Sequence, residues 1–205
     1  MVYGLGRIAS ASISVYKQPW DQSPIVYTRY RDEVINLYYE VNSEHGPAWN
    51  PTWYRVWGGY IHSRALHIVE NRPNLVVPSV RKSGQLAEVT IPFVQTMRYQ
   101  GKGSWEPLYR LYYGSVHWVV DVIEGPDDET WYRLQEPWGQ LTYDVPGEAM
   151  RFISDEDLMP ISPDVPAENK WIEVSIARQE LIAYEKDVIV FRTKVSTGLN
   201  PPVPE

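Results

Sequence analysis

An internal repeat constrains the fold of this chain more than any other feature of its sequence. Three separated segments recur at the same displacement, because 84 − 6, 90 − 12 and 131 − 53 all equal 78. The matched pairs are Gly6–Ala9 with Gly84–Ala87, Ser12-Ile13 with Thr90-Ile91, and Trp53–Val56 with Trp131–Leu134. Repeats at one displacement indicate two copies of one structural unit. We place copy one at residues 1–70 and copy two at residues 84–161, joined by a linker that contains Pro73 and Pro78.

Each copy is predicted to be a string of short β-strands. In copy one, polar and apolar residues alternate from Ile8 to Val15, as in a half-buried strand. Further strands are expected over Val34–Val41 and Trp53–Trp57, the latter followed by a Gly58-Gly59 turn. The chain has 15 Tyr, 9 Trp, 17 Pro and 13 Gly, a composition that favours strands and turns over long helices. About five short strands in 60 to 70 residues are typical of a small barrel.

A different pattern begins after the linker at residues 162–167. Ile172, Val174 and Ile176 alternate with polar or aromatic neighbours, and Leu181–Tyr184 and Val188–Val195 follow as two further strands. Antiparallel strands can be joined by tight turns, so we expect a three-stranded meander over residues 170–198. Between copy two and this meander, Ser154 and Asp157 have the spacing of a capping box, and Pro160 would end a helix after one turn. The acidic residues around them are expected to form a solvated turn rather than a calcium site.

These segments resemble two known families. Trp53-Tyr54-Arg55-Val56 with the following Gly-Gly-Tyr-Ile-His-Ser resembles the bacterial SH3-like module, although copy two departs from it after Leu134, where a longer loop is expected. The meander, with Gln179–Glu185 and Val195–Gly198, resembles the opening of a YkuD-type L,D-transpeptidase catalytic domain. The resemblance implies an all-β chain: two tandem SH3-like small barrels followed by a three-stranded antiparallel meander.

The resemblance also implies chemistry that this chain does not contain. In that family the nucleophile is the Cys of a Ser-His-Gly-Cys motif, which lies well downstream of the opening meander. The present sequence contains no Cys and no such motif, and its four His residues lie in the two copies. We therefore assign no catalytic residue and expect the chain to end before the family's catalytic segment. No cofactor is expected.

Charge and hydrophobicity limit the partners. The net charge is −7, with no basic stripe that could neutralise phosphates, so nucleic acid is not an expected partner. No apolar run has the roughly 18 residues of a membrane span, and the first residues lack the features of a signal peptide. The family resemblance implies a location in the cell envelope, with peptidoglycan peptide or glycan as the partner.

Five tryptophans are the candidate binding residues. Trp53 and Trp131 are expected to be core anchors, because strand residues next to each other point to opposite faces, although stacking on glycan or peptide remains an alternative. Tryptophans in loops are better candidates for a ligand surface. These are Trp20, Trp49, Trp57, Trp105 and Trp138. His62 and His117 are isolated, so no metal site is predicted.

Three functions fit the sequence. The chain could be the front part of a cell-wall L,D-transpeptidase, a non-catalytic SH3-like wall-binding protein, or a spacer. The residues encoded after Glu205 discriminate between them, since a Ser-His-Gly-Cys motif there supports the first.

The missing thiol gives a first prediction. An acyl-enzyme cannot form without a nucleophile, so incubation with a tetrapeptide donor, or with a β-lactam that acylates L,D-transpeptidases, will leave the intact mass unchanged. A covalent adduct seen by mass spectrometry would contradict the prediction.

Overall fold

The chain is all-β, as predicted. The computed structural model describes residues 4–48, 50–126, 128–136, 139 and 141–197. These residues form eighteen strands and three short 3₁₀ turns, and no α-helix occurs among them. The chain divides into two compact units, residues 1–153 and 154–205.

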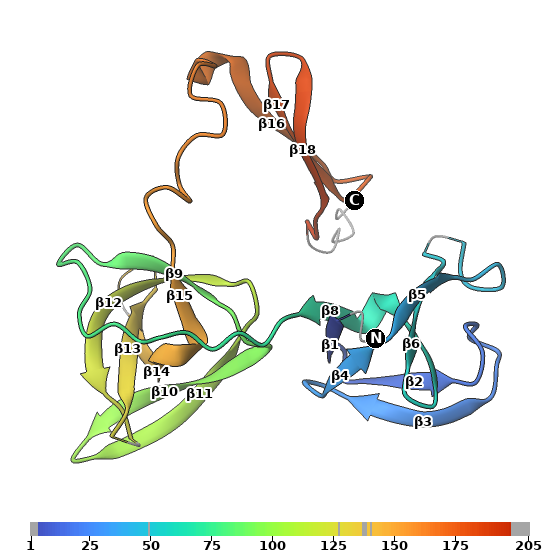
Figure 1. Cartoon of the computed structure of the whole chain (residues 1–205), viewed down its shortest axis with the longest axis horizontal. Helices are drawn as coiled ribbons and strands as arrows, with labels where there is room; N and C mark the ends of the chain where they lie inside the picture. The colour runs from blue at the N-terminus through green and yellow to red at the C-terminus, as the bar shows by residue number, and fades with distance from the viewer. Residues whose placement is uncertain (1–3, 49, 127, 137–138, 140, 198–205) are drawn as a thin grey trace, which may run out of the picture. The chain divides into compact units, whose positions relative to one another are not determined.

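Copy one consists of two small antiparallel sheets (Figure 1). The strand orders are β3-β2-β7-β6-β5 and β4-β1-β8. The strands are β1 (Gly4–Ile8), β2 (Ser12–Tyr16), β3 (Ile25–Tyr30), β4 (Val34–Leu37), β5 (Tyr39–Asn42), β6 (Thr52–Val56), β7 (Gly59–His62) and β8 (Leu66–Val69), with the 3₁₀ turn η1 (Ser63–Ala65) before β8.

Two predicted strands of copy one are interrupted. The strand expected over Ile8–Val15 is split into β1 and β2, and the strand expected over Val34–Val41 is split into β4 and β5. At the first break the backbone changes partners: Ala9 N–H donates to the carbonyl of Ala65, and Ala11 accepts from Arg31 N–H. Ala9 and Ala11 are hydrogen-bonded to different segments, so one continuous strand cannot run through both residues. The alternation of polar and apolar side chains does not reveal this break.

Copy two forms one seven-stranded antiparallel sheet. Its strand order is β11-β10-β14-β13-β12-β9-β15. The strands are β9 (Gln85–Val89), β10 (Phe93–Gly101), β11 (Ser104–Tyr112), β12 (Val116–Glu124), β13 (Thr130–Gln135), β14 (Thr142–Pro146) and β15 (Met150–Phe152), with η2 (Gly147–Ala149) before β15. The connection between β13 and β14 spans residues 136–141, against a two-residue turn in copy one, which confirms the longer loop predicted after Leu134.

The two copies have the same strand order. If β4 and β5 count as one strand interrupted at Tyr38, the order in copy one becomes β3-β2-β7-β6-(β5, β4)-β1-β8, which matches copy two strand for strand. Trp53 and Trp131 therefore occupy equivalent central strands. The barrels expected from the sequence are not closed among the described strands. The last strand of copy two, β15, is three residues long and pairs only with β9, so it cannot bridge to the opposite edge.

The displacement of 78 holds at the tryptophan strand but not at the first strand. Ile8 exchanges backbone hydrogen bonds with the turn at Asp32 and Glu33, and Val89 does the same with Gly114 and Ser115. Ile8 is thus equivalent to Val89, a displacement of 89 − 8 = 81. The predicted match of Gly6–Ala9 with Gly84–Ala87 is therefore wrong by three residues. Because three is an odd number, the predicted match would place each side chain on the opposite face of the sheet.

Each copy has its own apolar core. Each Val, Leu or Ile side chain that is removed from water stabilises the fold by roughly 1.5–3 kcal/mol. The fully buried members are Ile8, Val15, Leu37 and Ile61 in copy one, and Ala87, Val89, Val119, Leu134, Val145 and Ala149 in copy two.

A buried carboxylate joins the two copies. Asp32, in the β3–β4 turn, accepts a hydrogen bond from Arg7 of β1 at 2.8 Å, and the side chains are only 5% and 8% exposed. Its other oxygen accepts from Arg110 of β11 in copy two. The Arg7 guanidinium lies 4.0 Å from the centre of the Tyr112 ring. Burial, and then the Arg7 charge, lower the pKa of His67, whose Nδ1 is 3.4 Å from Arg7. A neutral His67 can therefore accept from the guanidinium.

The linker between the copies is bound along copy two. Residues 72–77 have no partner strand, yet backbone groups of Arg72, Asn74 and Val77 are hydrogen-bonded to copy two. The hydrogen bonds are Arg72 N to Thr90 O (2.9 Å), Thr90 Oγ1 to Arg72 O (2.7 Å), Asn74 N to Glu148 O (2.8 Å), Asn74 Nδ2 to Thr90 Oγ1 (2.6 Å) and Val77 N to the Tyr132 hydroxyl (2.7 Å). The linker is thus part of the folded unit rather than a loose spacer.

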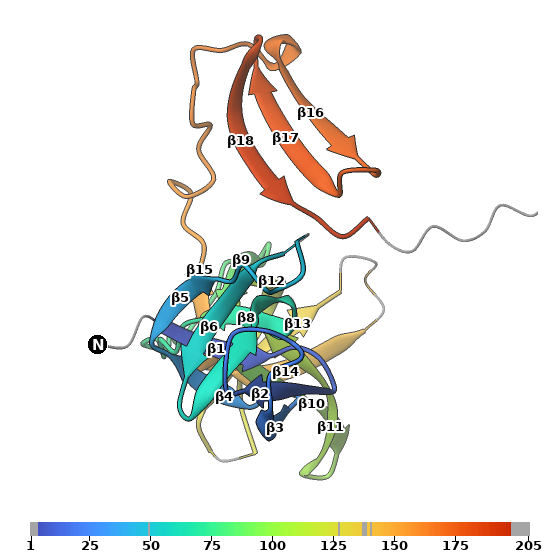
Figure 2. The same cartoon turned by 90° about the vertical axis from the view of Figure 1, so that its right-hand side faces the viewer.

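The second unit is a three-stranded meander, which Figure 2 shows with its strands side by side. It consists of β16 (Lys170–Ser175), β17 (Glu180–Glu185) and β18 (Val188–Lys194), preceded by the 3₁₀ turn η3 (Ala167–Asn169). The predicted meander is confirmed, with its last residue, Gly198, outside the described residues. Trp171 stacks on Tyr184 with ring centres 3.8 Å apart, but Ile182 is the one buried side chain among the described residues of this unit.

The capping box before the meander forms without a helix. Ser154 Oγ accepts from Asp157 N–H at 3.2 Å, and Asp157 Oδ2 accepts from Ser154 N–H at 3.1 Å. Residues 155–158 are a turn. The acidic cluster is thus a capped turn, as expected.

The buried carboxylate gives a stability prediction. Asp32→Asn will lower the free energy of unfolding by about 3 kcal/mol, because it leaves the buried Arg7 without a counter-charge. The backbone is not the cause, since Asp32 has φ of 66° and Asn tolerates that region well. Glu33→Gln is the control: its ion pair with Arg29 is about one-third exposed on both sides, so the loss should stay below about 1 kcal/mol. Equal losses for the two variants in urea titrations would contradict the assignment.

The meander should be the least protected part of the chain. Three strands are near the minimum for independent stability, and they need a surface to pack on. Amides of residues 172–194 should therefore exchange with deuterium faster than those of β6 and β13. Equal protection in a sample shown by light scattering to be monomeric would contradict this.

Candidate ligand-binding groove

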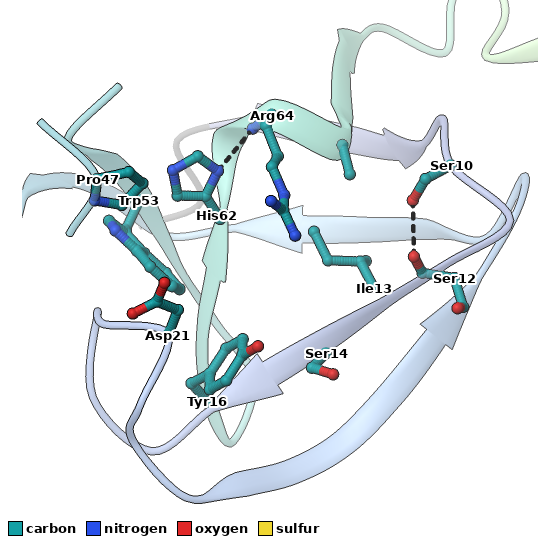
Figure 3. Close-up of a pocket in the computed structure, with 11 residues that line it drawn as sticks. Ser10, Ser12, Ile13, Ser14, Tyr16, Asp21, Pro47, Trp53, His62 and Arg64 are labelled. Atoms are coloured by element: carbon teal, nitrogen blue, oxygen red, sulfur yellow. Dashed lines mark hydrogen bonds between the residues drawn. The ribbon is translucent and has the colours of Figure 1, made fainter. Parts of the chain in front are cut away.

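A cavity of about 460 Å³ opens on one side of copy one (Figure 3). It lies between β2, the loop at residues 17–24, the loop at residues 43–51, and the end of β7 with η1. Its size falls in the range of small-molecule pockets. The lining residues are Ser10, Ser12, Ile13, Ser14, Tyr16, Asp21, Pro47, Trp53, His62, Arg64 and Ala65.

Trp53 forms the inner wall of this groove. The side chain is 1% exposed, which confirms its predicted role as a core anchor. Its ring contacts Tyr16 and His62 edge to face, at centroid distances of 5.6 and 4.9 Å. Gly46 is required beside it, because a Cβ there would lie 2.8 Å from the indole nitrogen. That buried nitrogen has no hydrogen-bond partner among the described residues.

His62 is held in one tautomer by two backbone contacts. Its Nδ1 accepts from Arg64 N–H at 3.1 Å (Figure 3). Its Nε2 lies 2.9 Å from the carbonyl of Asn50, which can only accept, so Nε2 carries the proton of this contact. Both ring nitrogens are hydrogen-bonded to backbone groups, so His62 is a poor candidate for a general base.

Two opposite charges face the groove without neutralising each other. Arg64 follows His62 in η1, and its guanidinium extends toward the middle of the groove (Figure 3). Asp21 comes from the 17–24 loop and lies beside Trp53. Neither side chain forms an ion pair with another residue that the structure describes. A cation and an anion held apart on one surface can bind a ligand that carries both charges.

Hydroxyl groups fill the remaining polar positions. Ser10 Oγ donates to the carbonyl of Ser12 at 2.8 Å, so it is used within the wall. The hydroxyls of Ser14 and Tyr16 form no hydrogen bond with another described residue, and both lie at the groove (Figure 3). They can donate to or accept from a ligand.

His62 does not offer the groove a free base. A nucleophile needs a base within hydrogen-bond distance, and the ring nitrogens of His62 are engaged with the backbone. In the described part of the chain, no three His, Asp or Glu residues are grouped so that they could hold a metal.

Copy two contains a serine–histidine pair that is structural. His117 Nε2 is 2.9 Å from Ser115 Oγ, but that hydroxyl is 2.7 Å from the carbonyl of Tyr112, which can only accept. The serine proton therefore points away from the histidine. Burial lowers the pKa of His117, so the ring is neutral near pH 7.

Of the five predicted tryptophans, the three that the structure describes do not line this groove. Trp20 contacts His45 edge to face at 5.6 Å and lines a neighbouring cavity of about 530 Å³. Trp57 is 72% exposed on the β6–β7 turn. Trp105 lies on strand β11 and not in a loop, and its ring packs on Trp131. Trp49 and Trp138 lie outside the described residues.

The sequence analysis missed the polar residues of the groove. The clearest available signal is Ser12 and Ser14, which alternate with apolar residues and so occupy one face of β2. Asp21 and Arg64 are 43 positions apart, and only the fold brings them to one groove.

Comparison with known proteins adds no family. No protein-family model matches the chain, and no curated protein matches it. In the described residues, no helix has the length and hydrophobicity of a membrane span.

Proposed function

We propose that this chain is the substrate-binding front part of a bacterial cell-wall L,D-transpeptidase. In this proposal the two copies are SH3-like modules, copy one binds peptidoglycan peptide, and the meander begins the catalytic domain. The partner and the envelope location are part of the same proposal. The observation that carries it is the groove of copy one, which has a buried aromatic wall and an unpaired charge of each sign.

The lining of the groove favours peptide over glycan. Sugars bind proteins by stacking on exposed aromatic faces as well as by hydrogen bonds. Trp53 offers no such face, because it is 1% exposed and covered by Tyr16 and His62. Arg64 and Asp21 instead match the carboxylate and ammonium groups of peptides.

The meander favours a transpeptidase over a binding protein alone. Three strands with turns at residues 176–179 and 186–187 agree with the opening meander implied by the family resemblance. Binding by copy one does not depend on this second part, so the groove argument holds for a non-catalytic wall-binding protein as well.

Co-sedimentation with purified peptidoglycan tests the proposed binding. The chain should sediment with intact sacculi and not with sacculi whose peptides an amidase has removed. Ser14→Trp, which fills the groove, should weaken binding at least roughly tenfold, equivalent to about 1.4 kcal/mol. Ser83→Trp, an exposed position before β9, should bind as the unchanged chain does. Failure to sediment with intact sacculi, or equal binding to both preparations, would contradict the proposal.

A further inference from the structure

In copy two a hairpin covers the tryptophan that corresponds to Trp53, and this distinguishes the two copies. Trp131 corresponds to Trp53, and the ring of Trp105 packs on it with centroids 5.8 Å apart. Tyr99 packs on the other side of Trp105, at 5.2 Å. Both come from the long β10–β11 hairpin, whose strands are nine residues each. In copy one the equivalent strands are shorter: β2 ends at Tyr16 and β3 begins at Ile25. The loop between them carries Asp21.

The charge at the mouth also differs between the copies. Ala65 and Ala149 are equivalent, because their carbonyls accept from Ala9 and Thr90 at the same position after the first strand. Arg64 therefore corresponds to Glu148, a reversal of charge. Three hydroxyl residues of β2 are likewise replaced in β10. Ser12, Ser14 and Tyr16 correspond to Phe93, Gln95 and Met97, all displaced by 81.

These differences separate a binding role from a folding role. Features needed only for folding should occur in both copies, as the buried tryptophan and its adjacent glycine do: a Cβ at Gly125 would lie 2.1 Å from the Trp131 ring. The exposed Arg64, the exposed Asp21 and the hydroxyls occur only where the groove is open. Two unpaired opposite charges have no role in the core of copy one.

We infer that the groove of copy one is a ligand site and that it takes a peptide end bearing both a carboxylate and an ammonium group. Arg64 binds the carboxylate, because its planar guanidinium can donate two parallel hydrogen bonds to the two oxygens. Asp21 binds the ammonium group. The hydroxyls of Ser14 and Tyr16 line the same groove and are further hydrogen-bond partners for the ligand. This inference rests on the proposed function, because it defines the chemistry of the same groove.

Three matched probes test the two charges separately. The first is N-acetyl-Ala-Lys, which carries a free carboxylate and an ε-ammonium group. The second is its C-terminal amide, which lacks the carboxylate. The third is its Nε-acetyl derivative, which lacks the ammonium group. Titrations of the full chain followed by NMR should give the tightest binding for the first probe, with a loss of roughly tenfold for each removed charge.

Single variants should remove one preference each. Arg64→Gln should bind the acid and the amide equally while still preferring the ammonium probe. Asp21→Asn should lose the preference for the ammonium group and keep that for the carboxylate. Glu148→Gln, at the equivalent position in copy two, should behave as the unchanged chain. Arg64, Asp21 and Glu148 are all exposed, so the variants should fold, and matching thermal melts will verify this.

The shift changes should fall on β2, β7 and the 17–24 loop, and not on β10, β11 or β14. Equal binding of the three probes, or equal shifts in both copies, would overturn the inference. If sacculi bind normally to the Arg64→Gln and Asp21→Asn variants and no probe binds, this inference fails and the proposed function stands. If the probes bind as expected and sacculi do not, the proposed function fails and the charge assignment stands.

Discussion

The buried carboxylate of Asp32 is the interaction on which the arrangement of residues 4–153 depends. It accepts hydrogen bonds from Arg7 of copy one and Arg110 of copy two. The Arg7 and Asp32 side chains are almost fully buried, and charges so far removed from water are costly unless they are paired with good geometry. The carboxylate thus joins the β3–β4 turn and β1 of copy one to strand β11 of copy two. The two copies are coupled at this site, although each has an apolar core of its own.

The same duplicated framework supports two different surfaces. In both copies a buried tryptophan lies against a glycine, and the central strands keep the same order. The difference lies in one hairpin. Where its strands are long, Trp105 reaches the equivalent tryptophan and covers it; where they are short, the space is left open and lined by polar groups. A change in hairpin length costs the core little, because residues of the hairpin tip do not belong to the fully buried set.

The sequence predicted strands, turns and the duplication because these depend on local spacing. Alternation at β16 is found where expected, and the turn predicted at Gly58-Gly59 lies one residue earlier, at Trp57-Gly58. It did not predict the corner at Ala9–Ala11, where backbone partners change, or the true register of the first strand, where side-chain similarity pointed three residues away. The groove was missed for a related reason. Its charged residues are far apart in sequence, whereas tryptophans give a local signal that does not tell a loop from a strand: Trp105 lies on β11 and packs on Trp131.

The bound linker has a consequence for how residues 4–153 move in solution. Two domains on a flexible tether tumble nearly independently, each with the short rotational correlation time of a small body. Here Arg72, Asn74 and Val77 are hydrogen-bonded to copy two, and Arg110 is bonded across to copy one. These bonds restrain the linker at residues 72, 74 and 77 and restrain the two copies against each other. The two copies should therefore reorient as one particle, so that a peptide captured by the first copy takes on the slow tumbling of both.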